Sequence, residues 1–561
     1  MRPEPEAATA PAKGPGAALI ALVIGSLAGA GFIAVMLGAM RSASKGRYDY
    51  PIFPRLLLFD DYRGAVAMFS ATLMVAALPP VRQIGARLAD AVTARPRATV
   101  GVALVLLCVA ARVVYLGHSL SMDEYAPRLQ AHAFAQGQFS ADFPPALTDR
   151  IVPKASRIFL FANSVTGQVN SAYWPGLALL MTPFALVNAE WMLNPLLSAL
   201  GLWLIFQLAT TLAGDKRAGG WAMLFALASP GFVANAISFY AMPGLLTLNL
   251  AFAWLIMRGT LASAGLAGLV GGLALVMHNP VPHAVFAAPW LLWLLFDRAR
   301  WPSLAAVLLG YLPVGAGVGV GWLLAVDAAN VKPVVEAHVS QGFVVDWVTR
   351  FRGVFSFPTG AMLLTRMGAT FKAWVWSMPG SFVLAGLAMR RRGDKPWTAL
   401  FAASLLVTYL FYFFVVMDQG HGWGYRYLHT SWSAVPVLAG AFVYRRTRGV
   451  ESALWRSWGG GLAVAGLLIT PFYLWQVRTN ITDSLAMRID APDEGRWVVF
   501  VAPDTMHYTV DLVQDYPGQD RVLTLLSEGD AADNLLITEQ VPGAVLSARD
   551  ARGSLWRLPD R

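Results

Sequence analysis

Apolar runs of about 15 to 23 residues, each bounded by charged residues, recur along most of this 561-residue chain. In lipid the backbone of such a run must satisfy its own hydrogen bonds, and a helix does so. The composition agrees, because 56% of the residues are hydrophobic and only 14% are charged, whereas a soluble domain carries roughly 25% charged residues. The chain is therefore predicted to be an all-α polytopic membrane bundle of about 13 transmembrane helices.

The predicted spans end where charged or loop-forming residues interrupt the apolar runs. They lie near residues 17–38, 64–80, 98–117, 195–213, 219–237, 243–257, 262–278, 283–296, 304–326, 373–389, 398–417, 429–444 and 457–476. The first run lacks a convincing cleavage site and is long enough to cross the bilayer, so we expect it to remain as an anchor. A shorter apolar run at 173–187 is expected to form an interfacial or half-inserted helix.

The spans divide the chain into four predicted parts. These are a disordered cytoplasmic tail at 1–16, two N-terminal transmembrane helices at 17–97, a main transmembrane domain at 98–477 with external loops 118–194 and 327–372, and a soluble extracytoplasmic α/β lobe at 478–561. Strand-like runs at 496–503 and 521–528 indicate the lobe, and we expect its carboxylates to be solvent exposed. At about 80 residues the lobe has room for only a modest core, so we expect it to pack against the membrane domain.

The short basic connections set the predicted orientation. They are DKR at 215–217, DRAR at 297–300, MRRRGDK at 389–395 and YRRTRGVESALWR at 444–456, and the positive-inside rule places them in the cytoplasm. The N-terminus is then inside and the C-terminus outside. Because these clusters account for much of the net charge of +10, nucleic acid is not expected as a partner. The basic segment 39–63 falls outside against this rule, so the orientation of the first two helices stays open.

Two adjacent carboxylates, Asp123 and Glu124, open the first external loop just after a predicted span. Neighbours on a helix do not share a face, so one can point toward a cavity and the other toward a supporting partner. The alternative is an ordinary solvated pair at the start of the next helix, where the helix dipole favours negative charge. Position alone does not separate these two interpretations.

A second candidate site is the external turn DQGHGWGYRYLHTSWSAVP at 418–436. Arg426 offers a planar fork suited to phosphate oxygens, and glycines permit close backbone approach. The flanking ring residues offer faces for a sugar or an isoprenoid; they are His421, Trp423, Tyr425 and Tyr427. The alternative is an aromatic belt at the membrane interface with a snorkelling arginine.

Several other polar residues fall on the predicted external side. His278 and His283 are five apart with prolines between them, which disfavours a metal site and favours hydrogen-bonded turn histidines. Cations that can meet an anionic head group are Lys154, Arg157, Arg366 and Lys372. The single cysteine, Cys108, excludes a disulfide framework and a cysteine-based metal site.

The order of these elements over roughly residues 98–445 resembles the GT-C superfamily of polytopic membrane glycosyltransferases, in its protein O-mannosyltransferase and lipid A aminoarabinose transferase branch. The resemblance rests on Asp123-Glu124, the Tyr-Trp-Pro-Gly turn at 173–176 and the Gly-Tyr-Arg-Tyr turn at 424–427. Many relatives carry Arg-Pro where this chain has His278-Asn279-Pro280, so the identity of the donor does not carry over.

The resemblance implies a GT-C-like, inverting glycosyltransferase of the bacterial inner membrane, acting on the periplasmic face. The donor would be a polyprenyl-phosphate-linked sugar and the acceptor a hydroxyl of a glycan, lipid or protein. Asp123 would be the catalytic base, while Glu124 would position the acceptor or help to hold a divalent cation; no other cofactor is implied. Arg426 would neutralise the departing phosphate, with Tyr425 and the four cations named above as further candidates. Residues for substrate contact are Tyr173, His278, His283, His421, Trp423 and Tyr427.

Three alternatives remain at this point. An O-antigen ligase or polymerase type of transferase also uses polyprenyl donors and fits the cationic loop 327–372. A lipid-linked sugar transporter or flippase is the second, although ionisable residues at mid-span are scarce. A scaffold or assembly subunit is the third. Arg128 is also close enough in sequence to pair with Asp123 and to neutralise it as a base.

Overall fold

The computed structural model describes residues 16–559 apart from 45, 48, 49, 330, 332–347, 350, 351, 391–395, 450, 505–507 and 520. The predicted tail up to residue 15 and much of the predicted loop 327–372 lie outside the described residues.

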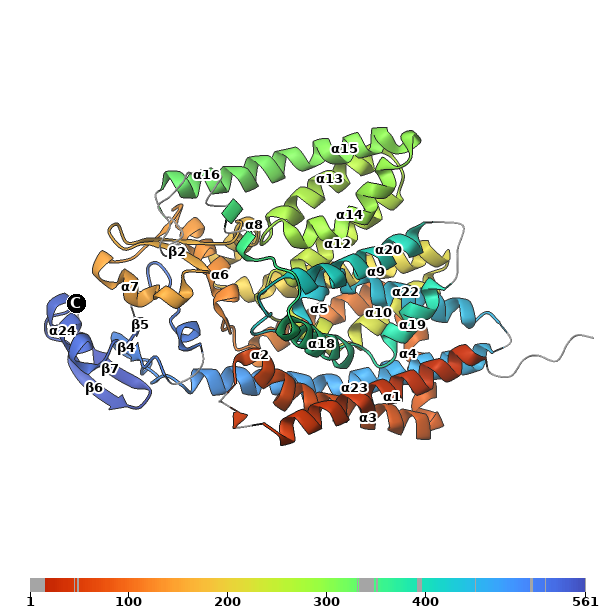
Figure 1. Cartoon of the computed structure of the whole chain (residues 1–561), viewed down its shortest axis with the longest axis horizontal. Coiled ribbons are helices and arrows are strands. Elements are labelled where there is room, and N and C mark those ends of the chain that lie inside the picture. Colours follow the sequence, from red (N-terminus) through yellow and green to blue (C-terminus); the bar gives the residue numbers. More distant parts are fainter. Residues whose placement is uncertain are drawn as a thin grey trace, which may run out of the picture.

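The membrane part is a bundle of helices that run along the long axis of the molecule (Figure 1). Its first helices are α1 (Ala17–Ser42), α2 (Ile52–Arg55), the π-helix η2 (Leu56–Asp61), α3 (Tyr62–Ala77), α4 (Pro79–Ala94) and α5 (Pro96–Val113). The central ones are α9 (Leu193–Ala213), α10 (Lys216–Leu227), α11 (Pro230–Ala236), α12 (Met242–Met257), α13 (Leu261–Val276), α14 (Val281–Leu295), α15 (Trp301–Tyr311), the π-helix η7 (Leu312–Val320) and α16 (Gly321–Ala328). The last are α18 (Gly360–Val375), α19 (Ser381–Met389), α20 (Trp397–Phe411), α21 (Arg426–Trp432), α22 (Ala434–Arg446) and α23 (Ser452–Leu485).

Six of the described helices are long and apolar enough to cross a membrane, and up to seven are if α3 and α4 form one bent span. The chain is therefore a multi-pass membrane protein. The predicted count of about 13 spans stays a prediction.

Three predicted spans are broken in the structure. The span at 373–389 is wrong as one helix, because α18 ends at Val375 and α19 begins at Ser381. The spans at 219–237 and 429–444 are interrupted between α10 and α11 and at Ser433. A helix break in lipid requires protein partners for the freed backbone groups. The break between α10 and α11 and the break between α18 and α19 provide such partners for each other. Gly231 N donates to Trp376 O at 2.7 Å, and Met378 N donates to Ser229 Oγ at 2.9 Å.

The N-terminal segment that opposed the positive-inside rule holds two buried carboxylates, Asp60 and Asp61, and each pairs with a cation. Arg47 lies 3.3 Å from Asp60, and Lys372 lies 2.6 Å from Asp61, both carboxylates coming from η2. The region predicted as two helices contains α1, α2, η2, α3 and α4. The chain bends by 98° between α3 and α4.

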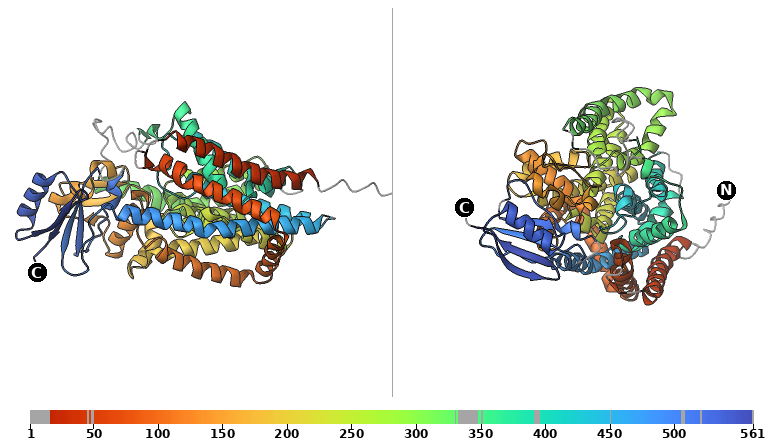
Figure 2. Two further views of the ribbon diagram at one scale, coloured as in Figure 1. Left: turned by 90° about the horizontal axis from the view of Figure 1, so that it is seen from below. Right: turned by 60° about the vertical axis from the view of Figure 1, so that its left-hand side comes forward.

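One end of the bundle carries the remaining elements. Helix α6 (Met122–Ala135), α7 (Thr148–Ile151), α8 (Gly176–Ala185) and a small antiparallel sheet in the order β1-β3-β2 come from the first loop. Its strands are β1 (Ala141–Asp142), β2 (Leu160–Asn163) and β3 (Gln168–Ser171). Figure 2 shows the C-terminal lobe at this same end of the bundle.

The C-terminal lobe is a four-stranded sheet, in the order β5-β4-β7-β6, with helix α24 (Asp530–Gln540). The two predicted strands are confirmed as β4 (Trp497–Val501) and β5 (Val522–Leu526), which pair in parallel. The sequence analysis did not predict β6 (Val545–Asp550) and β7 (Gly553–Arg557). Tyr125 and Leu129 of α6 share one apolar cluster with Phe500 and Leu525, so the lobe packs directly on the helix that carries the acidic pair.

Candidate functional site

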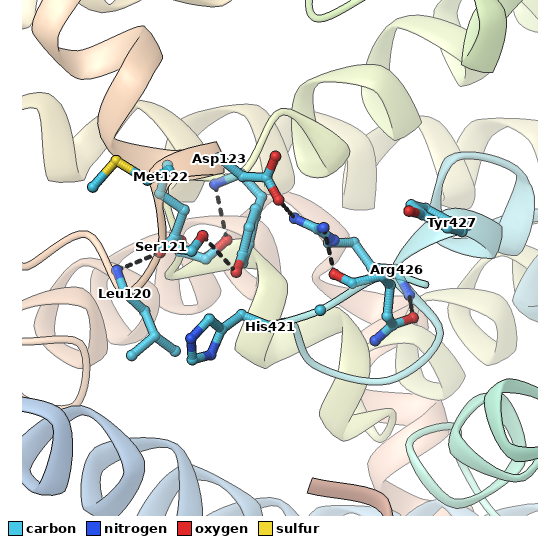
Figure 3. A network of polar contacts seen from close by, with 12 residues as sticks. Leu120, Ser121, Met122, Asp123, His421, Arg426 and Tyr427 are labelled. Atoms are coloured by element: carbon cyan, nitrogen blue, oxygen red, sulfur yellow. Dashed lines mark hydrogen bonds and ion pairs between the residues drawn. The ribbon is translucent and has the colours of Figure 1, made fainter. Parts of the chain in front are cut away.

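The acidic pair lies in the first turn of α6, after Ser121 at the N-cap position. Asp123 points away from the helix and meets Arg426, the first residue of α21, as Figure 3 shows. Its Oδ2 lies 2.7 Å from Arg426 Nη1, and its Oδ1 accepts a hydrogen bond from the hydroxyl of Tyr173. Residues from three distant parts of the sequence therefore converge on one carboxylate.

The turn before α21 holds Arg426 in a fixed direction. Its backbone N–H donates to Gln419 Oε1 at 3.0 Å, and its Nη2 donates to Gln419 O at 2.6 Å. The turn needs backbone angles that favour glycine, with φ of +129° at Gly422 and +67° at Gly424. A β-carbon on Gly424 would also lie 3.1 Å from the Trp376 side chain. Gln419 is therefore a positioning residue that the sequence analysis missed.

The surroundings of Asp123 keep its carboxylate charged. Burial alone would raise the pKa of Asp123, but Arg426, His278 and the Tyr173 hydroxyl together hold it below its usual value. Asp123 is therefore an ionised carboxylate at neutral pH. The Arg426 Nε–H is buried and has no hydrogen-bond partner among the described residues, which leaves one donor of the guanidinium for a ligand.

Arg128 does not neutralise Asp123. Its Nη1 donates to Ser119 Oγ at 2.8 Å and to Gly117 O at 3.2 Å. Its guanidinium lies 4.1 Å from the centre of the Phe239 ring. The partner of Asp123 is Arg426 instead.

Glu124 points into the protein, and the geometry does not support its predicted contact with an acceptor or a cation. Its side chain is fully buried. Oε1 accepts from Tyr115 Oη and from Phe239 N, each at 2.8 Å, and Oε2 accepts from Leu120 N at 2.6 Å. Glu124 thereby fixes the loop before α6 against the segment after α11. Within the described residues no three His, Cys, Asp or Glu side chains are grouped to hold a metal ion.

We expect the stability of the protein to fall as the pH rises toward about 7. Burial raises the pKa of Glu124 to about 7, so between pH 4.5 and this value the folded state holds a proton that the unfolded state has released. Asp515, whose pKa burial also raises to about 7, acts in the same direction. Thermal unfolding at pH 5 and pH 8 measures the effect, which is on the order of 1–3 kcal/mol. Glu124→Gln should flatten this dependence, and an unchanged slope would contradict the assignment.

The Tyr-Trp-Pro-Gly turn and His278 form one wall beside Asp123. The rings of Tyr173 and His278 lie 4.0 Å apart at 32°, and Trp174 N donates to His278 O at 2.9 Å. Burial lowers the pKa of His278 to about 4, so the ring is neutral at pH 7. Two predicted substrate residues are thus adjacent to the carboxylate.

Two tyrosine rings lie beside Arg426, one of them from the 418–428 turn. The Arg426 guanidinium lies 4.5 Å from the Tyr240 ring centre and 6.0 Å from that of Tyr427. Tyr427 donates to Asp418 O at 2.8 Å. Trp423 is buried, and its Nε1 donates to the hydroxyl of Tyr115 at 3.3 Å. The Tyr425 hydroxyl is buried without a described partner.

Of the other predicted site residues, His283 and Arg157 contact other side chains and Lys154 is exposed. His283 is buried and holds Asn249 and Tyr311 through its two ring nitrogens, each at 2.7 Å. Arg157 pairs with Asp149, while Lys154 is an exposed residue of a short 3₁₀ turn.

Arg366 and Lys372 lie in α18 rather than in an external loop, and both are buried. Arg366 donates to the carbonyls of Tyr412, Val415 and Met417 at 2.6–2.7 Å, which fixes the chain leading into the 418–428 turn. Lys372 is paired with Asp61. Both cations thus support the fold around the site instead of facing a head group.

The lobe contributes a residue that the sequence analysis missed. Asp511, in the 3₁₀ turn η9 (Thr509–Leu512), accepts from Met122 N through Oδ1 at 2.9 Å. Its Oδ2 lies 3.3 Å from His421 Nε2. The expectation that carboxylates of the lobe are solvent exposed is wrong for Asp511, Asp515 and Asp533, which are all buried. Asp511 links the N-terminus of α6 to the turn that carries Arg426.

Asp511→Ala should lower the rate of any reaction at Asp123 about 10-fold, because a small displacement of reacting groups is costly. The loss of a helix N-terminal acceptor should also cost about 0.5–2 kcal/mol of stability. The reaction rate and the unfolding temperature check both effects. Asp504→Ala, an exposed position of the same lobe, should change neither. A rate in Asp511→Ala equal to that of the control would contradict the positioning role.

Comparison with family models finds no match, and neither does comparison with curated proteins. Among solved structures, the chain is similar to ArnT from Cupriavidus metallidurans bound to undecaprenyl phosphate, at 14% identity and a TM-score of 0.52, over 82% of this chain and 98% of that one. ArnT of the same organism in the apo state matches at 14% identity and a TM-score of 0.49, over 81% and 97% of the two chains. The predicted resemblance is confirmed at the level of the fold alone, since this chain and ArnT share one fold.

Proposed function

We propose that this protein is an inverting glycosyltransferase, which moves a sugar from a polyprenyl-phosphate donor to a hydroxyl of a glycan, lipid or protein. One observation carries the proposal: an ionised, partly buried carboxylate, Asp123, lies 2.7 Å from an arginine that retains an unpartnered donor. A base and an anion-binding group side by side suit a reaction in which a proton leaves one substrate and a phosphate leaves the other.

In the proposed step, Asp123 accepts the proton of the acceptor hydroxyl as its oxygen attacks the anomeric carbon. The new carbon–oxygen bond forms on the face opposite to the departing phosphate, so the configuration inverts. The bond between the anomeric carbon and the donor oxygen breaks, and its electron pair leaves with the lipid phosphate. Arg426 neutralises that charge. The donor is already activated, and the step therefore needs no nucleotide.

The ion pair between Asp123 and Arg426 is the resting arrangement in this proposal. A donor phosphate that binds the free Nε–H of Arg426 competes with Asp123 for the guanidinium. Asp123 then loses its counter-charge, its pKa rises and it becomes a stronger base while the donor is bound. Gln419 and Tyr240 keep the guanidinium in place during this exchange.

The likeness in fold to a protein bound to undecaprenyl phosphate supports a polyprenyl phosphate as the donor lipid. We further propose that residues 98–477 form the catalytic domain and that residues 478–561 form a periplasmic lobe. The N-terminus would be cytoplasmic, in the inner membrane of a bacterium, as the basic connections indicate.

Mass spectrometry of glycans and lipids from cells with and without the gene tests the proposal. A change confined to one glycan or lipid is expected, and the missing sugar names the donor. No change in any glycan or glycolipid would contradict the proposed function.

A further inference from the structure

A polar cavity lies between α6 and the C-terminal lobe. Its volume is about 470 Å³, within the range of roughly 300–1,000 Å³ that is typical of ligand sites. The loop before α6, the end of the membrane domain and the lobe all contribute to it. Its lining includes His118, Arg128, Arg488, Gln514, Tyr516 and Arg521.

Three arginines line this cavity without a carboxylate partner. Within the described part of the chain, none of Arg128, Arg488 and Arg521 has an ion pair within 4.0 Å. Arg150, by contrast, reaches from the first loop to Asp533 of the same lobe at 3.0 Å. The lining also holds two carboxylates, Asp490 and Asp493, so its three arginines leave one positive charge that a bound anion would balance.

The donors of these arginines are only partly used. The Nε of Arg128 is buried and has no partner among the described residues. Arg521 Nη1 donates to backbone carbonyls of Pro492 and Asp493, at 2.7 and 3.0 Å. His118 lies close to Arg128 and Arg488, which with burial lower the pKa of its ring to about 3. The histidine is therefore neutral and can donate one hydrogen bond to an anion.

The cavity is separate from the pair that would hold the donor phosphate. Arg128 follows Asp123 by five residues on α6, and about 100° per residue turns it by roughly 140° around the helix. Arg128 also bonds to Gly117 and Ser119, on the far side of the loop that leads into α6.

We propose that this cavity binds a phosphate or carboxylate group carried by a glycan. Its arginines provide planar donors that match the oxygens of such a group. Asp490 and Asp493 at the same cavity can accept hydrogen bonds from sugar hydroxyls. The glycan would be the acceptor of the transfer, and this last part rests on the proposed function. The anion site itself does not depend on it.

Thermal unfolding of the full-length protein in detergent tests the anion site. The background is Arg426→Gln, which removes the other anion-binding group, and the probe is inorganic phosphate against chloride at equal ionic strength. Phosphate is expected to raise the unfolding temperature by several degrees. Arg488→Gln should abolish this shift, while Arg549→Gln, an arginine of β6 paired with Asp530, should retain it. No shift in any variant, or an equal shift in both, would overturn the proposal.

Glucose 1-phosphate, glucuronate and glucose then separate a glycan ligand from a free anion. If the site recognises a glycan, the two charged sugars should raise the unfolding temperature at concentrations at least about 10-fold lower than phosphate does. Glucose should not raise it. Equal potency of charged sugars and phosphate would overturn the glycan assignment. These measurements need no transfer activity, so they can succeed even if the proposed transferase reaction fails.

Discussion

Replacing Asp123 with asparagine is expected to lower sugar transfer by roughly 10²–10⁴, the range by which a positioned general base contributes to a rate. The amide cannot accept the proton of the acceptor hydroxyl, although it keeps the size of the side chain. Asparagine can still accept the hydrogen bond from the Tyr173 hydroxyl, so the fold should persist. Initial rates with a labelled polyprenyl-phosphate sugar measure the loss.

A matched control for this variant is Asp142→Asn. Asp142 is an exposed carboxylate of β1 in the same external loop. Its substitution removes the same charge and should leave transfer within about two-fold of the wild type. The unfolding temperature of both variants shows whether they fold. Full transfer in folded Asp123→Asn would exclude this residue as the base.

Arg426→Gln is expected to lower transfer by roughly 10²–10³, as removal of a preorganised donor does at other sites where negative charge develops. Arg426→Lys should recover only part of this loss, since an ammonium lacks the planar fork whose two nitrogens bond to Asp123 and to the Gln419 carbonyl. Arg426→Gln also changes the carboxylate. It removes the largest of the contributions that oppose burial, so the pKa of Asp123 rises.

The pH dependence of transfer distinguishes this explanation from simple misfolding. Because Asp123 works as an anion, a raised pKa moves the acid limb of the rate profile to higher pH in Arg426→Gln. Arg157→Gln removes an arginine that pairs with Asp149 in the first loop. It should keep both the rate and the profile of the wild type. An acid limb that does not move in Arg426→Gln would contradict the pairing as the cause.

The sequence predicted the class of fold and the two charged partners, but not their contact. The length of an apolar run indicates directly whether a helix can cross the bilayer, which is why the membrane bundle could be predicted. Asp123 and Arg426 each stood out by position beside a span. Their pairing, across 303 residues, depends on how the helices pack. Gln419 and Asp511 gave no local signal, because a glutamine before a glycine turn and an aspartate in a polar lobe are ordinary features.

Two of the predicted cations have partners that the sequence did not show. Arg366 and Lys372 were predicted to face a head group because they fall in the predicted external loop 327–372. In the structure Lys372 pairs with Asp61, more than 300 residues earlier, and Arg366 satisfies three carbonyls. A buried charge requires such a partner, yet its identity is set only by tertiary packing. The same holds for His283, whose two nitrogens find Asn249 and Tyr311.

The most direct test of the central proposal uses the purified protein in sealed proteoliposomes with a donor labelled in its sugar. The label is expected to move from the polyprenyl phosphate to a hydroxyl of an added acceptor extract, with inverted configuration at the anomeric carbon. The Asp123→Asn protein should leave the label on the donor. Label that crosses the bilayer while still attached to its lipid, or transfer that is equal in the two proteins, would contradict the proposal.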